Sequence, residues 1–303
     1  MYDISFPHLG IVIEHLGRSI SINGFEIAYY GIIIGLGMIL GIQMVCRDAA
    51  KLGDDPDTYT DVLLIAIVAG IICARAYYVF FSWDMYKDDP IQVFNIRGGG
   101  LAIYGGVIGG LTATYIYTRI KKKSFLRLCD LIMPGVLVGQ IMGRWGNFFN
   151  CEAFGAYTDC LLAMRIRLAL VGSNMLGGDV LSHVIVDNGT QYIQVHPTFL
   201  YESFLNLCLL LYMRHHRKHQ LFEGELFWTY IGGYGLIRMF VEGLRTDSLM
   251  IGNTGIRVSQ MIAGICFVTA MIMIKTGRDR ARAAGIVYSA DYHSRNQTEA
   301  DET

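Results

Sequence analysis

The sequence is dominated by apolar stretches of about 20 residues, the length at which a helix crosses the ~30 Å hydrocarbon core of a bilayer. Hydrophobic residues make up 53% of the 303 residues, and charged residues make up only 17%. Soluble domains carry roughly 25% charged residues, so this chain has too little charge to cover a soluble globule. We therefore predict a polytopic membrane protein.

Seven stretches are long and apolar enough to be transmembrane helices, so the predicted fold class is an all-α polytopic membrane protein. An odd number of crossings places the two termini on opposite sides of the membrane. Lys and Arg are enriched in cytoplasmic loops, and one set of connections carries fourteen of them against six in the other. This bias predicts an N-terminus outside and a C-terminus inside. The predicted spans are residues 27–46, 60–82, 98–118, 128–149, 197–213, 224–244 and 257–274.

A polar insertion between the fourth and fifth spans is predicted on the outer face. Its segments 164–170 and 183–195 have the pattern of strands, and the second contains an Asn188-Gly189 turn. We therefore expect a small extracytoplasmic α+β cap. The predicted parts are an extracytoplasmic N-terminal arm (1–26), transmembrane helices one to four (27–149), the cap (150–196), transmembrane helices five to seven (197–274) and a polar cytoplasmic tail (275–303) predicted to be disordered.

Composition also limits the partners. The formal net charge of −1 gives no argument for nucleic acid. No cluster of His, Cys, Asp or Glu has metal-ligand spacing within the apolar spans, so neither a metal nor another cofactor is expected. Most of the seven cysteines fall inside those spans and are predicted to be free thiols. Cys151 and Cys160 lie in one loop, and a disulfide between them is the alternative.

Ionisable side chains are costly inside a bilayer, so those within the spans are candidate functional residues. Arg144, Arg238 and Glu242 lie about 21 to 27 Å along spans that run outward, at 1.5 Å per residue. Alone, Arg75 fits a snorkelling residue or an ion-paired strut, and Arg238 and Glu242 can simply neutralise each other at i,i+4 spacing. The convergence of these polar side chains on one depth in the membrane favours a functional site over those separate interpretations. The inward-running helices bring further polar groups to the same outer half: Tyr30, Tyr104, His196, Tyr201 and Glu202.

Two segments at this depth fit an anionic ligand. Gly98, Gly99 and Gly100 lie at the outer N-terminus of the third span, where free N–H groups at a helix start favour an anion, although such a segment more often reflects packing. The second segment, residues 143–155, holds an arginine, two asparagines and a glutamate. Arg144 can bind phosphate through two nitrogens, and asparagines can hold hydroxyls. The sequence therefore predicts a site for a lipid phosphate of the outer leaflet.

These segments resemble the prolipoprotein diacylglyceryl transferase family of bacteria. The resemblance implies a multi-pass enzyme of the plasma membrane, with its active site facing the outer leaflet. It implies transfer of the diacylglyceryl group of phosphatidylglycerol to the lipobox cysteine of preprolipoproteins, forming a thioether and releasing glycerol phosphate. The matching pieces are AYYGIIIGLG (28–37), RGGGLAIYGGVIGG (97–110), GRWGNFFNCEAFG (143–155), HPTFLYES (196–203) and YGLIRMFVEGLRTDSL (234–249).

The resemblance also implies residue roles. Arg144 matches the essential phospholipid-binding arginine and Arg238 the second essential arginine, and Tyr234 and Tyr104 complete the candidate catalytic set. Many members have a histidine, the proposed base, where this chain has Tyr104. Because the unperturbed pKa of tyrosine is about 10, Tyr104 is expected to position the substrate, or to act as a base only if the arginines lower its pKa. The candidate substrate-binding residues are Arg144, Asn147, Tyr30, Glu152, Gly155, Glu242, Gly98, Gly99, Gly100 and His196.

Other functions fit less well. A transporter or channel for anionic solutes also needs arginines at depth, but it predicts inverted repeats and polar groups through the inner half of the membrane, and the sequence has neither. An intramembrane protease needs a GxSG or GxGD motif in a span, whereas Gly177-Gly178-Asp179 lies in the predicted cap. A structural scaffold would leave the polar cluster unexplained.

Overall fold

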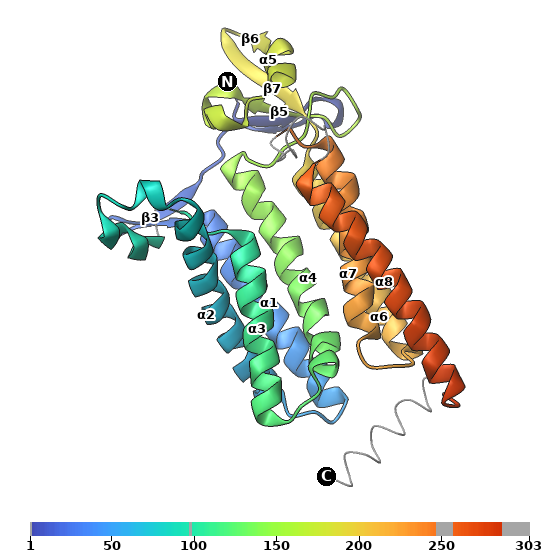
Figure 1. Cartoon of the computed structure of the whole chain (residues 1–303). Coiled ribbons are helices and arrows are strands. Elements are labelled where there is room, and N and C mark those ends of the chain that lie inside the picture. The colour runs from blue at the N-terminus through green and yellow to red at the C-terminus, as the bar shows by residue number, and fades with distance from the viewer. Residues whose placement is uncertain (1, 97–98, 247–256, 287–303) are drawn as a thin grey trace. The chain divides into compact units, whose positions relative to one another are not determined.

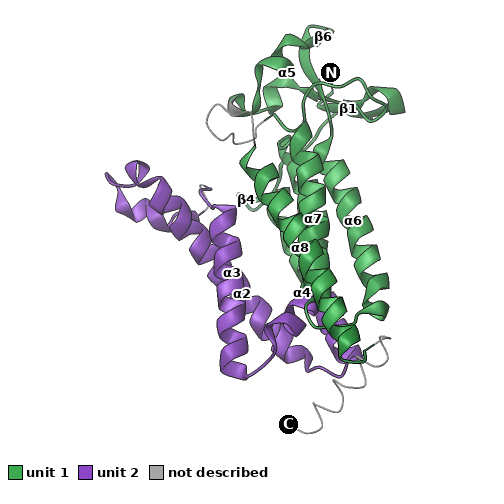
Figure 2. Ribbon diagram, turned by 45° about the vertical axis from the view of Figure 1, so that its right-hand side comes forward, with its two compact units in different colours: residues 1–41, 133–303 green, residues 42–132 purple. Residues whose placement is uncertain are grey.

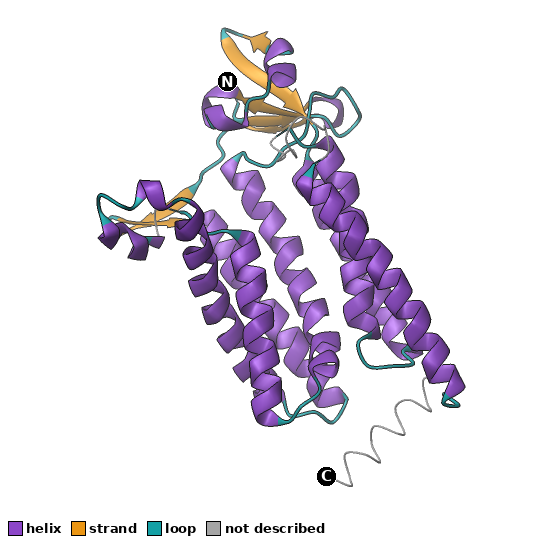
Figure 3. Ribbon diagram, viewed as in Figure 1, coloured by secondary structure: helices purple, strands orange, loops and turns teal. Residues whose placement is uncertain are grey.

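The computed structural model describes residues 2–96, 99–246 and 257–286, most of which are helical (Figures 1 and 3). The chain divides into two compact units (Figure 2). Unit 1 comprises residues 1–41 and 133–303, and unit 2 comprises residues 42–132. The prediction of a disordered tail over residues 275–303 is wrong for its first part, because residues 275–283 form the end of helix α8 (Val258–Ala283). The part of that prediction beyond residue 286 lies outside the described residues.

Each predicted span contains a helix. By length and composition, α1, α2, α4 and α8 are the candidate membrane spans within the described residues. Local signals set some of the ends: Asp55 accepts hydrogen bonds from the N–H groups of Asp57 and Thr58 at the start of α2, and Lys122 ends α3 in a left-handed conformation. The helices are α1 (Tyr29–Lys51), α2 (Pro56–Phe81), α3 (Ile103–Lys121), α4 (Phe125–Asn150), α6 (Thr198–His216), α7 (Glu225–Leu244) and α8 (Val258–Ala283).

A five-stranded antiparallel sheet belongs to unit 1 and includes the predicted strands. These are β5 (Met164–Arg167), β6 (Ile185–Asp187) and β7 (Thr190–Val195), with positive φ at Asn188 and Gly189 in the hairpin turn. The order β2-β1-β5-β7-β6 adds two N-terminal strands, β1 (Ile4–Phe6) and β2 (Ile11–Ile13), that were not predicted. Residues 4–13 of the predicted N-terminal arm therefore form part of this sheet. A second hairpin pairs β3 (Ser19–Ile22) with β4 (Phe25–Ala28), and α5 (Gly178–Ser182) is a single short turn.

The core of the sheet holds two helix ends in place. Ile4 and Ile193 are fully buried and pack in one cluster with Phe148, near the end of α4, and Phe199, at the start of α6. Burying such side chains stabilises the unit by about 1.5 to 3 kcal/mol each. The same sheet region contains Cys151, which is a free thiol like Cys160, so the alternative of a disulfide between them is wrong.

Glycines allow close helix packing in both units. A Cβ at Gly41 in α1 would lie 2.7 Å from the carbonyl oxygen of Gly135 in α4, and one at Gly235 in α7 would lie 2.8 Å from the carbonyl oxygen of Ala263 in α8. In unit 2, a Cβ at Gly105 in α3 would lie 2.5 Å from the carbonyl oxygen of Cys73 in α2. Such contacts are typical of helices that associate in lipid.

Candidate active site

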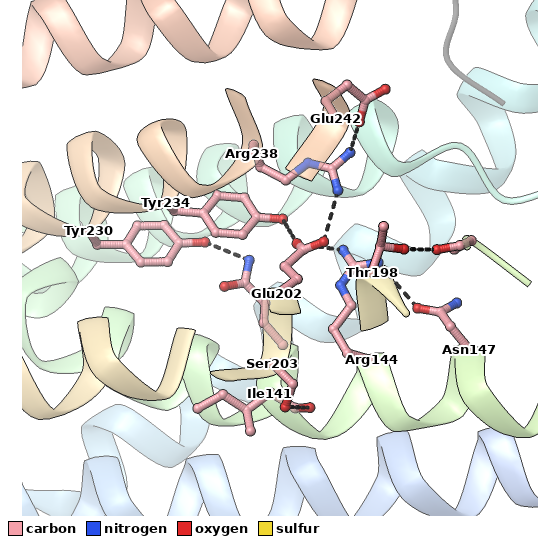
Figure 4. Close-up of polar contacts among 12 residues, drawn as sticks. Ile141, Arg144, Asn147, Thr198, Glu202, Ser203, Tyr230, Tyr234, Arg238 and Glu242 are labelled. Carbon is pink, nitrogen blue, oxygen red and sulfur yellow. Dashed lines mark hydrogen bonds and ion pairs between the residues drawn. The ribbon is translucent and has the colours of Figure 1, made fainter. Parts of the chain in front are cut away.

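One carboxylate joins two arginines of unit 1 (Figure 4). Glu202, in the second turn of α6, places Oε1 2.9 Å from Nη2 of Arg144 on α4. Its other oxygen, Oε2, lies 3.0 Å from Nη1 of Arg238 on α7. The Glu202 side chain is only 2% exposed. A carboxylate this deeply buried needs cationic partners, and here the two partners come from two different helices.

The α7 side of the cluster adds a second carboxylate and a phenol. Glu242 lies one helical turn after Arg238, and its Oε2 is 2.5 Å from Arg238 Nη2. The hydroxyl of Tyr234 donates to Glu202 Oε1 at 3.3 Å. Arg257 donates to the backbone carbonyl of Glu242. The predicted pairing of Arg238 with Glu242 is therefore present, but Arg238 is also bound to Glu202.

The α4 side extends toward the sheet through neutral amides. Arg144 Nη1 donates to Asn147 Oδ1 at 3.2 Å, and Asn147 Nδ2 donates to Glu152 Oε1 at 2.8 Å. Asn150 also donates to Glu152 Oε1, at 3.2 Å. Cys151 has a φ of 52°, which ends α4 in a left-handed turn. That turn directs the chain back toward the end of α4. The Glu152 carboxylate can therefore accept hydrogen bonds from Asn147 and Asn150.

Two glycines in the segment of residues 143–155 are required by packing. A Cβ at Gly146 would lie 2.5 Å from Cδ2 of Tyr30, which is in the first turn of α1. A Cβ at Gly155 would lie 2.8 Å from both the carbonyl oxygen of Leu244 and Cβ of His196. The Gly155 N–H also donates to the His196 carbonyl at 2.9 Å. Gly155 thus lets the loop after α4 pass next to the chain that enters α6.

His196 lies at the entrance to α6, one residue before the proline that precedes the helix. Its Nδ1 is 3.3 Å from the hydroxyl of Tyr201. Burial lowers the pKa of the His196 imidazole below its ordinary value. The ring is therefore neutral near pH 7, and it bonds to Tyr201 rather than to the arginines.

The Gly-rich segment and Tyr104 belong to unit 2. Tyr104 is in the first turn of α3, and its side chain is exposed. Gly99 and Gly100 have φ values of 88° and 74°, whereas Gly98 lies outside the described residues. The structure therefore places this part of the predicted site in a different compact unit from Arg144.

Arg75 organises the loop before α3. It is buried, and its guanidinium donates to the carbonyls of Gly99 and Gly100, each at 2.9 Å, and to three other carbonyls between residues 92 and 95. The expectation of a snorkelling or ion-paired arginine is wrong, because backbone oxygens bind this cation inside the unit. A Cβ at Gly100 would collide with Arg75 Nη1, so this glycine is required by packing.

Glu202 is the central residue that the sequence-based site omitted. Its depth grouped it with the other polar residues, and an acidic residue within an apolar helix was a signal in itself. Neither the sequence spacing nor the resemblance gave it a partner. Only the packing of α6 with α4 and α7 shows that its two oxygens reach two arginines.

Comparison with known proteins decides the family. The model of the family described as prolipoprotein diacylglyceryl transferase matches residues 18–276. The chain belongs to the prolipoprotein diacylglyceryl transferase family. As a member it is an enzyme, a transferase of lipoprotein biosynthesis. The matched range includes all of the charged cluster around Glu202.

Similar proteins carry the full name phosphatidylglycerol–prolipoprotein diacylglyceryl transferase. The one from Bacillus cytotoxicus is 42% identical over 282 residues, covering 92% of this chain and 96% of that protein. The one from Clostridioides difficile is 41% identical, covering 82% of this chain and 90% of that protein. The one from Halalkalibacterium halodurans is 40% identical, covering 86% of each chain. The similarity to these diacylglyceryl transferases thus extends over nearly the whole sequence.

Gly146→Ala is expected to lower kcat/KM of this transferase by at least about 10-fold, because displacing a positioning group by about 1 Å can cost 10²-fold. The added methyl group would displace Tyr30, a candidate substrate-binding residue. Gly143→Ala is the matched control, since a Cβ there meets no atom within 4 Å. Both variants would be compared with wild type in a transfer assay. Equal losses in the two variants would contradict a specific role for the contact between Gly146 and Tyr30.

Proposed function

We propose that Arg144 and Arg238 bind the phosphate of phosphatidylglycerol in the reaction of this enzyme. The enzyme transfers the diacylglyceryl group of phosphatidylglycerol to prolipoproteins, the first step of lipoprotein maturation. One observation carries the proposal: a single buried carboxylate, that of Glu202, is held between the two guanidinium groups. Guanidinium groups that bind one carboxylate in common also suit the oxygens of a phosphodiester.

The reaction is a displacement at the glycerol carbon that carries the phosphate. The thiolate of the lipobox cysteine forms the carbon–sulfur bond as the carbon–oxygen bond to phosphate breaks. The electron pair of the broken bond stays on the phosphate oxygen, which leaves as glycerol phosphate. Cations next to that oxygen stabilise its developing charge, and cations near the thiol favour the thiolate. Arg144 and Arg238 supply both effects.

The neighbouring polar residues suit the glycerol head group. Asn147 and Glu152 are hydrogen-bonded to each other beside Arg144, and together they offer donors and acceptors for hydroxyl groups. Tyr30 and Tyr234 supply two further hydroxyls. Glu242 holds Arg238, whereas Gly155 and His196 position the chain between the sheet and α6.

The membrane topology is part of the proposal. Seven transmembrane helices, at α1 to α4 and α6 to α8, would place the N-terminus and the five-stranded sheet outside the cytoplasm and the C-terminal tail inside. The excess of Lys and Arg in the opposite loops supports this orientation. The enzyme would then lie in the plasma membrane and take both substrates at the outer leaflet.

A reconstituted transfer assay tests the proposed function. Vesicles would contain the enzyme and either labelled phosphatidylglycerol or labelled diacylglycerol, and a lipobox peptide would accept the lipid. We expect a thioether-linked diacylglyceryl peptide from phosphatidylglycerol only, and none from a peptide whose cysteine is replaced by serine. Equal transfer from diacylglycerol, which has no phosphate, would contradict a phosphate-binding role for the arginines.

Tyr104→Phe is expected to lower kcat/KM by less than about 10-fold, the range of a lost hydrogen bond to substrate rather than of a lost general base. The change removes only the phenolic hydroxyl, which we propose positions the substrate. The pH dependence of kcat/KM is expected to remain that of wild type. A loss of 10³-fold or more, together with a shifted pH profile, would instead make the Tyr104 hydroxyl the group that takes the thiol proton.

A further inference from the structure

Glu202 occupies the place that the proposed function gives to a phosphate. Its two carboxylate oxygens accept from Arg144 at 2.9 Å and from Arg238 at 3.0 Å, and the Tyr234 hydroxyl donates to Oε1 at 3.3 Å. A carboxylate and a phosphodiester are both monoanions that offer two acceptor oxygens to a guanidinium. A lipid phosphate therefore competes with Glu202 for the same donors.

Arg144 and Arg238 have different partners. This difference indicates which of the two ion pairs of Glu202 breaks when a phosphate binds. Both terminal nitrogens of Arg238 are bound by carboxylates, those of Glu202 and Glu242. Arg144 binds one carboxylate, that of Glu202, and the neutral amide of Asn147. If a phosphate replaces Glu202 at Arg144, the charge next to Arg144 is unchanged. Glu202 can meanwhile remain bound to Arg238 through Oε2.

We propose that Glu202 is a positioning residue that acts as an internal counter-anion in this reaction. It holds Arg144 and Arg238 in the arrangement that a phosphodiester requires, and it gives up Arg144 when the lipid phosphate binds. After transfer it returns to Arg144 and helps to displace the glycerol phosphate. This inference rests on the proposed function, because it assumes that the two arginines bind the phosphate of the lipid.

Glu202→Gln is the decisive variant, because it keeps the size of the side chain and removes its charge. With the competing anion gone, the inhibition constant of glycerol phosphate is expected to fall by about 10-fold. The value of kcat is expected to fall by about 100-fold, because no carboxylate returns to Arg144 to displace the glycerol phosphate and the product therefore leaves slowly. A residue that served only to stabilise the fold would weaken inhibition and turnover together. The opposite movement of kcat and of product affinity is therefore specific to this role.

Two further variants complete the test. Glu202→Asp keeps the charge but shortens the side chain, so its kcat and its inhibition constant are expected to lie between those of wild type and Glu202→Gln. Ser203→Ala is the matched control on α6, because the Ser203 hydroxyl donates to the Ile141 carbonyl at 3.2 Å, whereas the described ion pairs of the charged cluster are made by Glu202, Arg144, Arg238 and Glu242. It is expected to keep the wild-type constants.

The outcomes distinguish a failure of the counter-anion role from a failure of the proposed function. Unchanged or weaker inhibition by glycerol phosphate in Glu202→Gln would overturn the counter-anion role. If that variant does not fold, the same result in Glu202→Asp would overturn it. Arg144→Ala tests the proposed function itself: unchanged inhibition by glycerol phosphate in Arg144→Ala would mean that the arginine does not bind the phosphate.

Discussion

Arg144→Lys is expected to lower kcat/KM by at least about 100-fold, the loss typical of removing a preorganised donor to a developing anion. Lysine keeps the positive charge but lacks the planar fork of arginine. It cannot contact both Glu202 and Asn147 as the two terminal nitrogens of Arg144 do. The loss would be measured with labelled phosphatidylglycerol and a lipobox peptide.

Arg165→Lys is the matched control for that variant. Arg165 lies in β5, where its Nε donates to Gln194 at 2.8 Å, and it belongs to the sheet rather than to the charged cluster. Its replacement by lysine is expected to change kcat/KM by less than about 2-fold, as for a surface substitution away from the site. Full activity in Arg144→Lys would remove the phosphate-binding role that we give to Arg144.

Arg238→Gln is expected to lower stability as well as activity. It leaves the carboxylates of Glu202 and Glu242, whose side chains are 2% and 4% exposed, without the cation between them. Removing one partner of a buried pair costs about 3 to 5 kcal/mol. Thermal unfolding in detergent would report the change in stability, and the transfer assay would report a loss of at least about 100-fold in kcat/KM.

A charge-balanced double variant separates the two effects of Arg238. Replacing Glu242 with Gln in the Arg238→Gln background removes the carboxylate that has lost its ion pair with Arg238, while Glu202 keeps its ion pair with Arg144. The double variant is therefore expected to recover much of the stability. Activity is expected to stay low, because the guanidinium is still missing. Recovery of activity along with stability would instead mean that Arg238 serves only to neutralise Glu242, the simpler interpretation that the i,i+4 spacing allows.

Elements with a long regular pattern could be predicted from the sequence. Apolar runs of about 20 residues predict each of the long helices, because the length of such a run alone indicates a helix that can cross lipid. The hairpin of β6 and β7 has alternating residues and an Asn188-Gly189 turn. By contrast, β1 and β2 are three residues each, too short to show a period, and they form because β1 pairs with β5 and β2 pairs with β1 in the folded sheet.

One part of the candidate site could likewise be predicted from the sequence, and another part could not. Arg144, Asn147 and Glu152 lie within nine residues, and local turns bring them together. The role of Glu202 depends on helices far apart in the sequence, and a single sequence contains no record of that contact. The partners of Arg75 could not be predicted from the sequence for the same reason, because they are backbone carbonyls of a loop some 20 residues away. Spacing identifies neighbours on one element, whereas contacts between elements come from the packing.

The most direct test of the account is an experimental structure of the enzyme with phosphatidylglycerol bound. We expect phosphate oxygens within about 3 Å of the terminal nitrogens of Arg144, the distance of a charge-assisted hydrogen bond. We also expect Glu202 to remain paired with Arg238 and to lose its contact with Arg144. A lipid phosphate bound elsewhere, with Arg144 still paired to Glu202, would contradict the central claim that these arginines bind the phosphate.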